Sequence, residues 1–217
     1  MTTSLSMASS LIRALTPERR AVVTAAAWEC IDLTHYFAKR GRNAVTTLQH
    51  GASFAWWKHY PARDAHDERG GACYYYHAHV VQPQVDDEHG HFHVFLQPSR
   101  AEPVTHIVAL SIDAHGLPVS ACTVNRWVTG ERMRPAREVM AAIRDFRLDT
   151  GRPRRNVDRW LASLIRLFSP QIEWLLMERD RRIAAAPGRA HTLEDRELHV
   201  LSRCPVSIAS QIEALDG

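Results

Sequence analysis

Apolar side chains recur at helical spacing near the start of the chain. From Val22 to Phe37 they follow one another three or four positions apart, and Gly41 ends the pattern. The preceding Thr16–Glu18 combines a capping hydroxyl, a proline for the first turn and an acid, which is typical of a helix start. The pattern therefore predicts one long helix here and a second, interrupted helix over residues 44–60.

The apolar period changes to two between Cys73 and Val128, which favours β-structure. Four runs in this part of the chain are predicted strands: Tyr74–Val81, His91–Gln97, Thr105–Asp113 and Leu117–Trp127. The connections between them are short, and Asp113–Gly116 is typical of a hairpin turn. Consecutive strands with short connections predict an antiparallel meander, and the polar segment Pro61–Gly71 before them predicts a loop.

Helical spacing returns after Gly130. Five segments are predicted helices: Met133–Leu148, Arg155–Phe168 with Asn156 as its cap, Ser169–Pro187, Glu194–Arg203 and Ser207–Leu215. The chain is therefore expected to have an α+β fold, in which a central antiparallel meander of about four strands is flanked by N-terminal and C-terminal helices. Residues 1–150 would form the α+β domain, and residues 151–217 a C-terminal helical region packed on the same domain.

Composition places the chain among ordinary globular proteins. Of its 217 residues, 45% are hydrophobic and 24% charged, and its apolar runs are too short to span a bilayer. The sequence carries no secretory signal, and its four scattered cysteines include no CxxC pair. Reduced thiols, a cytoplasmic location and no membrane association are therefore expected. Arginines accumulate after residue 126, and a solvated helical surface accounts for them better than a nucleic-acid interface does.

Five histidines fall within residues 74–95, YYYHAHVVQPQVDDEHGHFHVF, on two predicted strands. Because side chains alternate along a strand, the histidines of each run share one face. They are His77 and His79 in the first run and His89, His91 and His93 in the second. One hairpin register places His79 opposite His91 and brings paired Cβ atoms to about 4.5–5.5 Å. The same register sets His77 opposite His93, with the acidic residues 86–88 at the lip of this face.

A cluster of neutral imidazoles suits a divalent transition metal such as zinc, iron, nickel or copper. The predicted metal ligands are His77, His79, His91 and His93. Glu88 is expected to act as a further ligand or as a general base, with a position left for water or substrate. Tyr74–Tyr76, Phe92 and Phe95 would line the pocket. Three other interpretations stay open: metal-free catalysis, a solvent-facing hairpin, or a buried hydrogen-bonded layer of tyrosines and histidines.

The segment GACYYYHAH, residues 71–79, resembles the start of the first cupin motif, a glycine followed after five residues by His-x-His. The resemblance implies a cupin-like metal arrangement around His77 and His79. The glutamate of the cupin motif would fall at Pro83 or Gln84, whereas Glu88 comes later in the chain. No second cupin motif follows.

The segment HGHFHVFL, residues 89–96, resembles the motif of histidine-triad nucleotide hydrolases and transferases, with Gly90 where an apolar residue is expected. That resemblance implies that His91 is a nucleophile attacking an α-phosphate. The order of YYYHAH, EHGHFHVF and SIDAHGLPVSACTVNRW also resembles an uncharacterised bacterial protein family.

Together these features predict a histidine-rich metal-binding protein, in the form of a metal-dependent hydrolase or oxygenase acting on a small molecule. One alternative is a histidine-triad-like enzyme with His91 as nucleophile. Another is a non-enzymatic, metal-responsive or interaction protein that uses its basic helical surface. Two further histidines receive structural roles: His106 is expected on an edge strand and His199 on a C-terminal helix.

Overall fold

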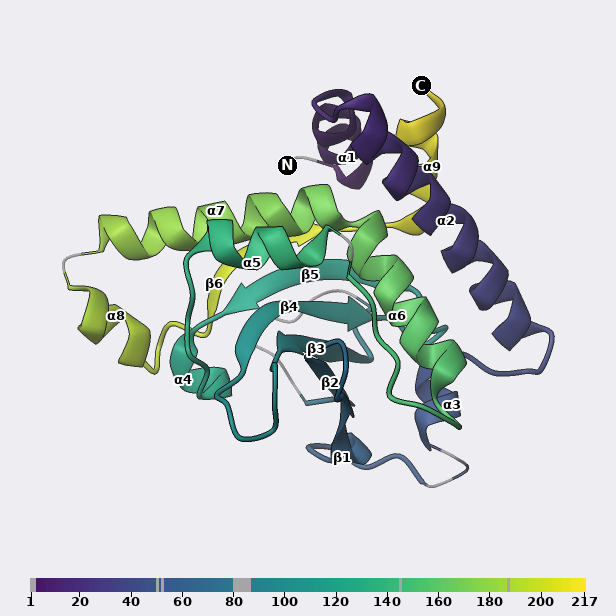
Figure 1. Ribbon diagram of the computed structural model, residues 1–217, viewed down its shortest axis with the longest axis horizontal. Coiled ribbons are helices and arrows are strands. Elements are labelled where there is room, and N and C mark those ends of the chain that lie inside the picture. Colours follow the sequence, from purple (N-terminus) through teal and green to yellow (C-terminus); the bar gives the residue numbers. More distant parts are fainter. Residues whose placement is uncertain (1–2, 50, 52, 80–86, 145, 187) are drawn as a thin grey trace.

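The computed structural model describes residues 3–49, 51, 53–79, 87–144, 146–186 and 188–217 (Figure 1). Within them the chain forms helices at both ends and an antiparallel sheet between them, so the predicted α+β fold is confirmed. Residues 80–86, which include the end of the first predicted histidine strand and Asp86, lie outside this part of the chain.

Three helices precede the sheet: α1 (Ser4–Arg13), α2 (Pro17–Ala38) and α3 (Ala44–Gln49). The predicted start of α2 is confirmed, because the hydroxyl of Thr16 accepts a hydrogen bond from the backbone N–H of Arg19. The predicted helix over residues 44–60 is much shorter than expected. It ends at Gln49, and the chain turns at Gly51 with a φ of +77°, which a helix cannot accommodate.

The sheet contains six strands in the order β1 to β6, so each strand pairs with the next one along the chain. They are β1 (Tyr60–Asp67), β2 (Ala72–His77), β3 (Gly90–Leu96), β4 (Thr105–Ile112), β5 (Pro118–Val124) and β6 (Val200–Pro205). Every pairing is antiparallel. The predicted meander is therefore confirmed, with six strands rather than about four.

The two outer strands, β1 and β6, were not predicted. β1 lies where a polar loop is predicted, because this edge strand exposes residues 62–64 and buries only its ends. β6 begins inside the segment Glu194–Arg203 that is predicted to be a helix and continues past its end, so the prediction is wrong for residues 200–203. Short apolar patterns fit both helical and extended periods, and hydrogen bonding of β6 along β5 decides the outcome.

Six helices accompany β6 in the second half of the described chain: α4 (Arg126–Thr129), α5 (Ala136–Ile143), α6 (Arg155–Leu167), α7 (Ser169–Ala185), α8 (Arg189–Glu194) and α9 (Ile208–Asp216). β5 stops before the predicted Trp127, because the side chain of Asn125 caps α4. α5 begins later than predicted, since Pro135 precedes its first turn. α6 begins after Arg154, so Asn156 is not its cap.

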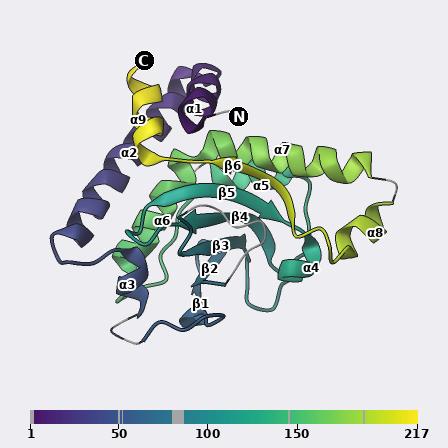
Figure 2. The same cartoon turned by 180° about the vertical axis from the view of Figure 1, so that it is seen from behind.

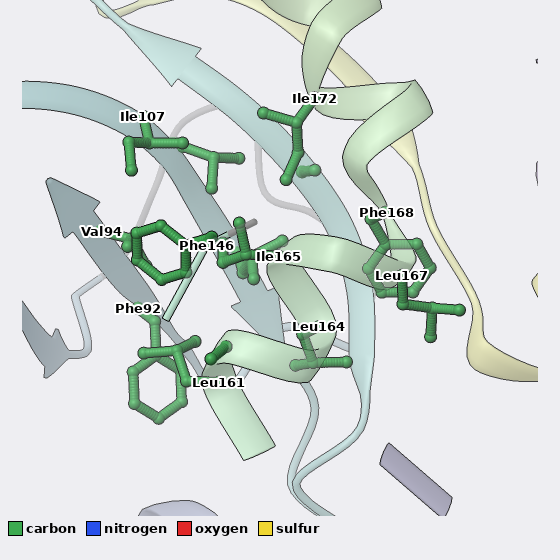
Figure 3. Packing of buried hydrophobic residues seen from close by; sticks show 14 of the residues in the cluster. Phe92, Val94, Ile107, Phe146, Leu161, Leu164, Ile165, Leu167, Phe168 and Ile172 are labelled. Atoms are coloured by element: carbon green, nitrogen blue, oxygen red, sulfur yellow. The ribbon is translucent and has the colours of Figure 1, made fainter. Parts of the chain in front are cut away.

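Helices α6 and α7 cover one face of the sheet, and α2 packs against α6 (Figures 1 and 2). In the core, Phe92 and Val94 of β3 lie near Leu161 and Ile165 of α6 (Figure 3). Tyr74 points to the same side and donates its hydroxyl to Asp158 of α6 at 2.8 Å. The even-numbered residues of β2 and β3 therefore face the helices, and the odd-numbered residues face the opposite side.

The region after residue 150 is not purely helical, because β6 belongs to it and completes the sheet. A division of the chain into domains at residue 150 stays a prediction. Near the chain ends α1 packs against α9, and both lie beside α2 (Figure 2). All four cysteines are buried and free, as expected. In the described ranges, no helix is long and apolar enough to cross a membrane.

Candidate metal centre

The pairing of β2 with β3 brings two of the predicted ligands directly opposite each other. His77 pairs with His91, and Tyr75 pairs with His93. The predicted register, with His79 opposite His91, is therefore wrong by two residues. Because the error is an even number, it moves no side chain to the other face of the sheet. His77, His91 and His93 still share the odd-numbered face.

Gly90 explains how β3 can begin directly beside the end of β2. A Cβ at this position would lie 2.6 Å from the carbonyl oxygen of His77 and 2.5 Å from the hydroxyl of Tyr76. Any larger residue would thus push the two strands apart at the point where the imidazoles meet. The glycine is a departure from the histidine-triad pattern, but here it permits the close approach of the strands.

Three imidazoles converge on this face. The Nε2 atoms of His77 and His91 are 2.8 Å apart. Adding His93 gives one ligand nitrogen from each ring, with all three nitrogens within 4.8 Å of one another. His91 and His93 are buried and His77 is half-buried. Nitrogen atoms this close from three separate rings can hold a metal ion.

Glu88 fixes the orientation of His91. Its Oε1 lies 2.6 Å from Nδ1 of His91, so that nitrogen carries a proton and Nε2 is directed at His77. Burial opposes the charged form of Glu88, but hydrogen bonds from His91 and Ser111 and the charge of His91 outweigh it and lower the pKa of the carboxyl group. A carboxylate on the outer nitrogen of a histidine is the usual support for a metal ligand.

His106 plays the corresponding part for His93. Nδ1 of His93 lies 3.1 Å from Nε2 of His106, which leaves Nε2 of His93 for the shared space. The prediction of an edge-strand His106 is wrong, because β4 lies between β3 and β5. Alternation along β4 would place His106 on the helix-covered face. A β-bulge, in which Val94 pairs with Val108 and Phe95 with His106, turns it toward His93 instead.

His77, His93 and His106 are neutral at physiological pH. Burial, followed by the neighbouring histidines, lowers the pKa of His77 to about 2. Burial and the adjacent His91 also lower the pKa of His93 well below its usual value. For His106, burial and then the charge of Arg179 lower the pKa to about 3. Neutral rings keep the lone pairs that a metal ion requires.

Of the other two histidines of the motif, His79 lies beside the three rings, with its ring centroid 4.9 Å from that of His77, and His89 lies apart from them. His79 follows β2, stacks on Trp57 with ring centroids 4.5 Å apart, and lies 5.0 Å from the ring of His91. His89 does not share the histidine face as predicted, because its Nδ1 lies 2.6 Å from the hydroxyl of Tyr76 and its ring contacts Phe54. It precedes β3 and so escapes the alternation of that strand.

The aromatic residues divide between the two faces of the sheet. Tyr75 contacts His93 and Phe95, with ring centroids 5.1 and 5.7 Å away. The helix-covered face holds the other three predicted pocket residues, Tyr74, Tyr76 and Phe92, so that part of the prediction is wrong. His59 was not predicted as part of this face, although its ring stacks on Tyr75 with centroids 3.9 Å apart. It falls in the segment predicted as a helix, residues 44–60, so no strand pattern connected it with Tyr75.

Beside the imidazoles lies a cavity of about 50 Å³. Five of its lining residues are His79, Glu88, His91, His93 and His199. The others are Ala109, Ser111, Cys122, Val124, Val128, Val200 and Arg203. His199 is not on a helix, as predicted, but directly precedes β6. The imidazole cluster thus opens onto a small space of mixed polar and apolar lining.

Residues 24–206 match the family described as a domain of unknown function (DUF6969). The chain belongs to this DUF6969 family. The predicted membership of an uncharacterised family is thereby confirmed, whereas the resemblances to cupins and histidine-triad proteins are not supported. No curated protein and no solved structure matches the chain.

The DUF6969 match spans the complete sheet, from β1 to β6. It therefore includes His77, His91 and His93, together with Glu88 and His106 that orient two of them. Helices α1 and α9 fall outside the matched residues. The candidate metal centre thus belongs to the part of the chain that defines the family.

Proposed function

We propose that this DUF6969 protein binds one divalent transition-metal ion through His77, His91 and His93 and uses it to act on a small molecule. The observation that carries the proposal is the contact between the Nε2 atoms of His77 and His91, 2.8 Å apart. Two nitrogens bound to one ion in a tetrahedral arrangement are about 3.3 Å apart, given bonds of about 2.0–2.1 Å. A shift of roughly half an ångström would therefore seat an ion between them.

The hydrogen bonds that orient His91 and His93 also favour metal binding by the three rings. Glu88 and His106 each bind the Nδ1 atom of one ligand, and both leave Nε2 for the ion. This arrangement gives Glu88 a positioning role, in place of the role of ligand or general base that the sequence suggested. His79 lies close enough to His91 to serve as a fourth ligand or to border the open position.

Three histidines leave at least one coordination position for water or substrate, which is the arrangement of catalytic rather than structural zinc sites. An ion held there would supply Lewis-acid chemistry or activate a bound water. The adjoining cavity supports an enzyme over a metal sensor, because a sensor does not need space beside the ion. Imidazole ligands suit zinc, iron, nickel and copper alike.

Elemental analysis of protein purified without a histidine tag tests the proposal. We expect one equivalent of metal in the wild type and none in His77→Ala/His93→Ala. His115→Ala is the matched control, because His115 is exposed in the turn between β4 and β5. Circular dichroism of the double variant separates loss of ligands from loss of fold.

Metal that persists in the folded double variant would overturn the assignment of ligands. Wild-type protein that takes up no zinc, iron, nickel or copper on dialysis would overturn the metal site itself. If such metal-free protein hydrolysed an adenosine phosphoramidate, the histidine-triad alternative with His91 as nucleophile would replace it.

A further inference from the structure

One row of paired residues crosses the histidine face from β2 to β6. Tyr75 pairs with His93, His93 with Ala109, Ala109 with Cys122, and Cys122 with Arg203. Directly paired residues point to the same side of a sheet. The register alone therefore places the guanidinium of Arg203 on the same face as the candidate metal ligands.

The two residues between His93 and Arg203 in this row are small. Ala109 and Cys122 are buried, and both line the cavity beside the imidazoles. Three strand spacings of about 4.8 Å put the backbones of His93 and Arg203 about 14 Å apart. Their long side chains extend from the two ends of the row, while the small side chains between them form a hollow floor.

The walls of this cavity are mainly apolar. Val124, Val128 and Val200 line it on the side of β5 and β6. Ser111 and Ser120 form the next row, with their hydroxyl groups 3.0 Å apart. The cavity therefore has a metal-binding end with Glu88 beside it, an aliphatic middle and one cationic residue, Arg203.

Arg203 differs in its partners from Arg166 and Arg179, which are also half-buried or buried. Arg166 forms an ion pair with Glu29 and Arg179 with Asp180. Among the described residues, no carboxylate forms an ion pair with Arg203. Its guanidinium faces the thiol of Cys122 instead. Glu88 also lines the cavity, and the charge of Arg203 helps to lower its pKa, but the carboxylate of Glu88 is bonded to His91. A half-buried guanidinium that lines a cavity and forms no direct ion pair with a described carboxylate is suited to an anionic ligand.

We propose that Arg203 binds the carboxylate of a short aliphatic carboxylic acid, whose other end approaches the metal ion. This inference rests on the proposed metal-dependent function and adds the class of substrate. A planar carboxylate accepts two parallel hydrogen bonds from one guanidinium and carries a single charge. A cavity of about 50 Å³ has room for roughly four water-sized groups, which limits the ligand to a few carbon atoms.

Ligand-observed NMR with acetate, propionate and lactate tests the proposal, on zinc-loaded and on metal-free protein. We expect at least one acid to bind the wild type, and Arg203→Gln to weaken that binding at least tenfold while the metal content stays unchanged. Arg126→Gln is the matched control, because Arg126 pairs with Glu194 on the surface and does not line the cavity. Propanol, a neutral molecule of similar size, should not bind.

A second variant, Cys122→Leu, fills the floor of the cavity and leaves Arg203 in place. We expect it to abolish binding of the acids without loss of metal. This variant tests the need for the cavity, whereas Arg203→Gln tests the need for the charge. Equal binding by wild type and Arg203→Gln, or no binding of any of the three acids, would overturn the proposal. Binding of inorganic phosphate that depends on Arg203, with no binding of the acids, would assign Arg203 to a different oxyanion.

The measurements on metal-free protein distinguish a failure of the proposed acid site from a failure of the proposed metal site. Binding of acids that depends on Arg203 but not on zinc would retain Arg203 as the anion site and overturn the link to the metal. Stoichiometric zinc without Arg203-dependent binding would retain the metal centre and overturn the substrate class.

Discussion

The two faces of the sheet bury different kinds of side chain. In β3, Phe92 and Val94 point into the apolar core beneath α6, whereas His91 and His93 point away from it into a layer of imidazoles. Both faces are buried, so exposure to water does not explain the difference. One face lowers the free energy of the fold, and the other positions reactive groups.

The histidine face is costly to bury without a ligand. Desolvation holds His77 and His93 in their neutral form, and taking polar rings out of water offsets much of the free energy that their hydrogen bonds contribute. The apolar face offsets this cost, because each fully buried large apolar side chain contributes about 1.5–3 kcal/mol. We therefore expect substitutions on the helix-covered face to lower stability, and substitutions on the histidine face to weaken metal binding.

The largest effect is expected on the apolar face. Phe92→Ala removes a fully buried ring and should lower the free energy of unfolding by about 3–5 kcal/mol. His77→Ala, at a half-buried position on the other face, should cost about 1 kcal/mol or less in the presence of a chelator. Urea denaturation measures both, and similar losses in the two variants would contradict the division of roles.

A smaller effect is expected at Glu131, which is buried and accepts a hydrogen bond from the backbone N–H of His106. Burial, opposed by that hydrogen bond and by Arg179, raises the pKa of Glu131 to about 7. The folded state therefore binds more protons than the unfolded state between pH 4.5 and about 7, and stability falls as the pH rises through this range.

Glu131→Gln removes this titration and keeps an oxygen acceptor for His106. At pH 8 the variant should be more stable than the wild type by on the order of 3 kcal/mol, and the two should converge below pH 4.5. Urea denaturation in chelator at several pH values tests this. Glu102→Gln, at an exposed position, is the control, and a stability difference that did not change with pH would contradict the assignment.

Metal binding at the histidine face is expected to stabilise the folded protein. At a free zinc concentration one hundred times the Kd, binding should raise the free energy of unfolding by about 2.7 kcal/mol. Thermal melts with and without zinc measure this stabilisation. It should disappear in His77→Ala and stay intact in His115→Ala; the same gain in both variants would place the ion elsewhere.

The smallest effect concerns the carboxylate behind His91. Glu88→Gln keeps an oxygen near Nδ1 of His91 but removes its charge, and it should weaken metal binding tenfold to a hundredfold. Asp87→Asn is the control, since Asp87 is the adjacent, exposed residue. Competition with a chromophoric chelator gives the affinities. Complete loss of metal in Glu88→Gln would make Glu88 a direct ligand.

Alternation along the strands was enough to predict the histidine face but not its register. Parity alone places His77, His91 and His93 on one side, and parity is insensitive to an even shift in pairing. The true register depends on the contact of Gly90 with His77 and Tyr76, which no local pattern reveals. The bulge that turns His106 toward His93 is equally invisible, because it breaks the alternation on which the prediction rests.

Long-range pairing limited the rest of the prediction. The segment containing Arg203 shows apolar spacing that fits a helix, and only the free edge of β5 makes it a strand. Arg203 was therefore missed as a site residue, although Tyr75 and the three residues that connect it with Arg203 across the sheet lie in segments predicted as strands. The start of α2 was predicted correctly because its signals are local, a capping hydroxyl and a proline.

The order of the strands also sets the order in which the site is made. Residues 60–124 supply β1 to β5 and all three imidazoles, whereas β6 and Arg203 follow only after residues 125–199. At about 5–20 residues per second, a ribosome needs roughly 4–15 s to synthesise that interval. During this time the segments of β1 to β5, with all three imidazoles, exist without β6, the strand that pairs with the edge of β5. All three candidate metal ligands are therefore synthesised before the strand that carries Arg203.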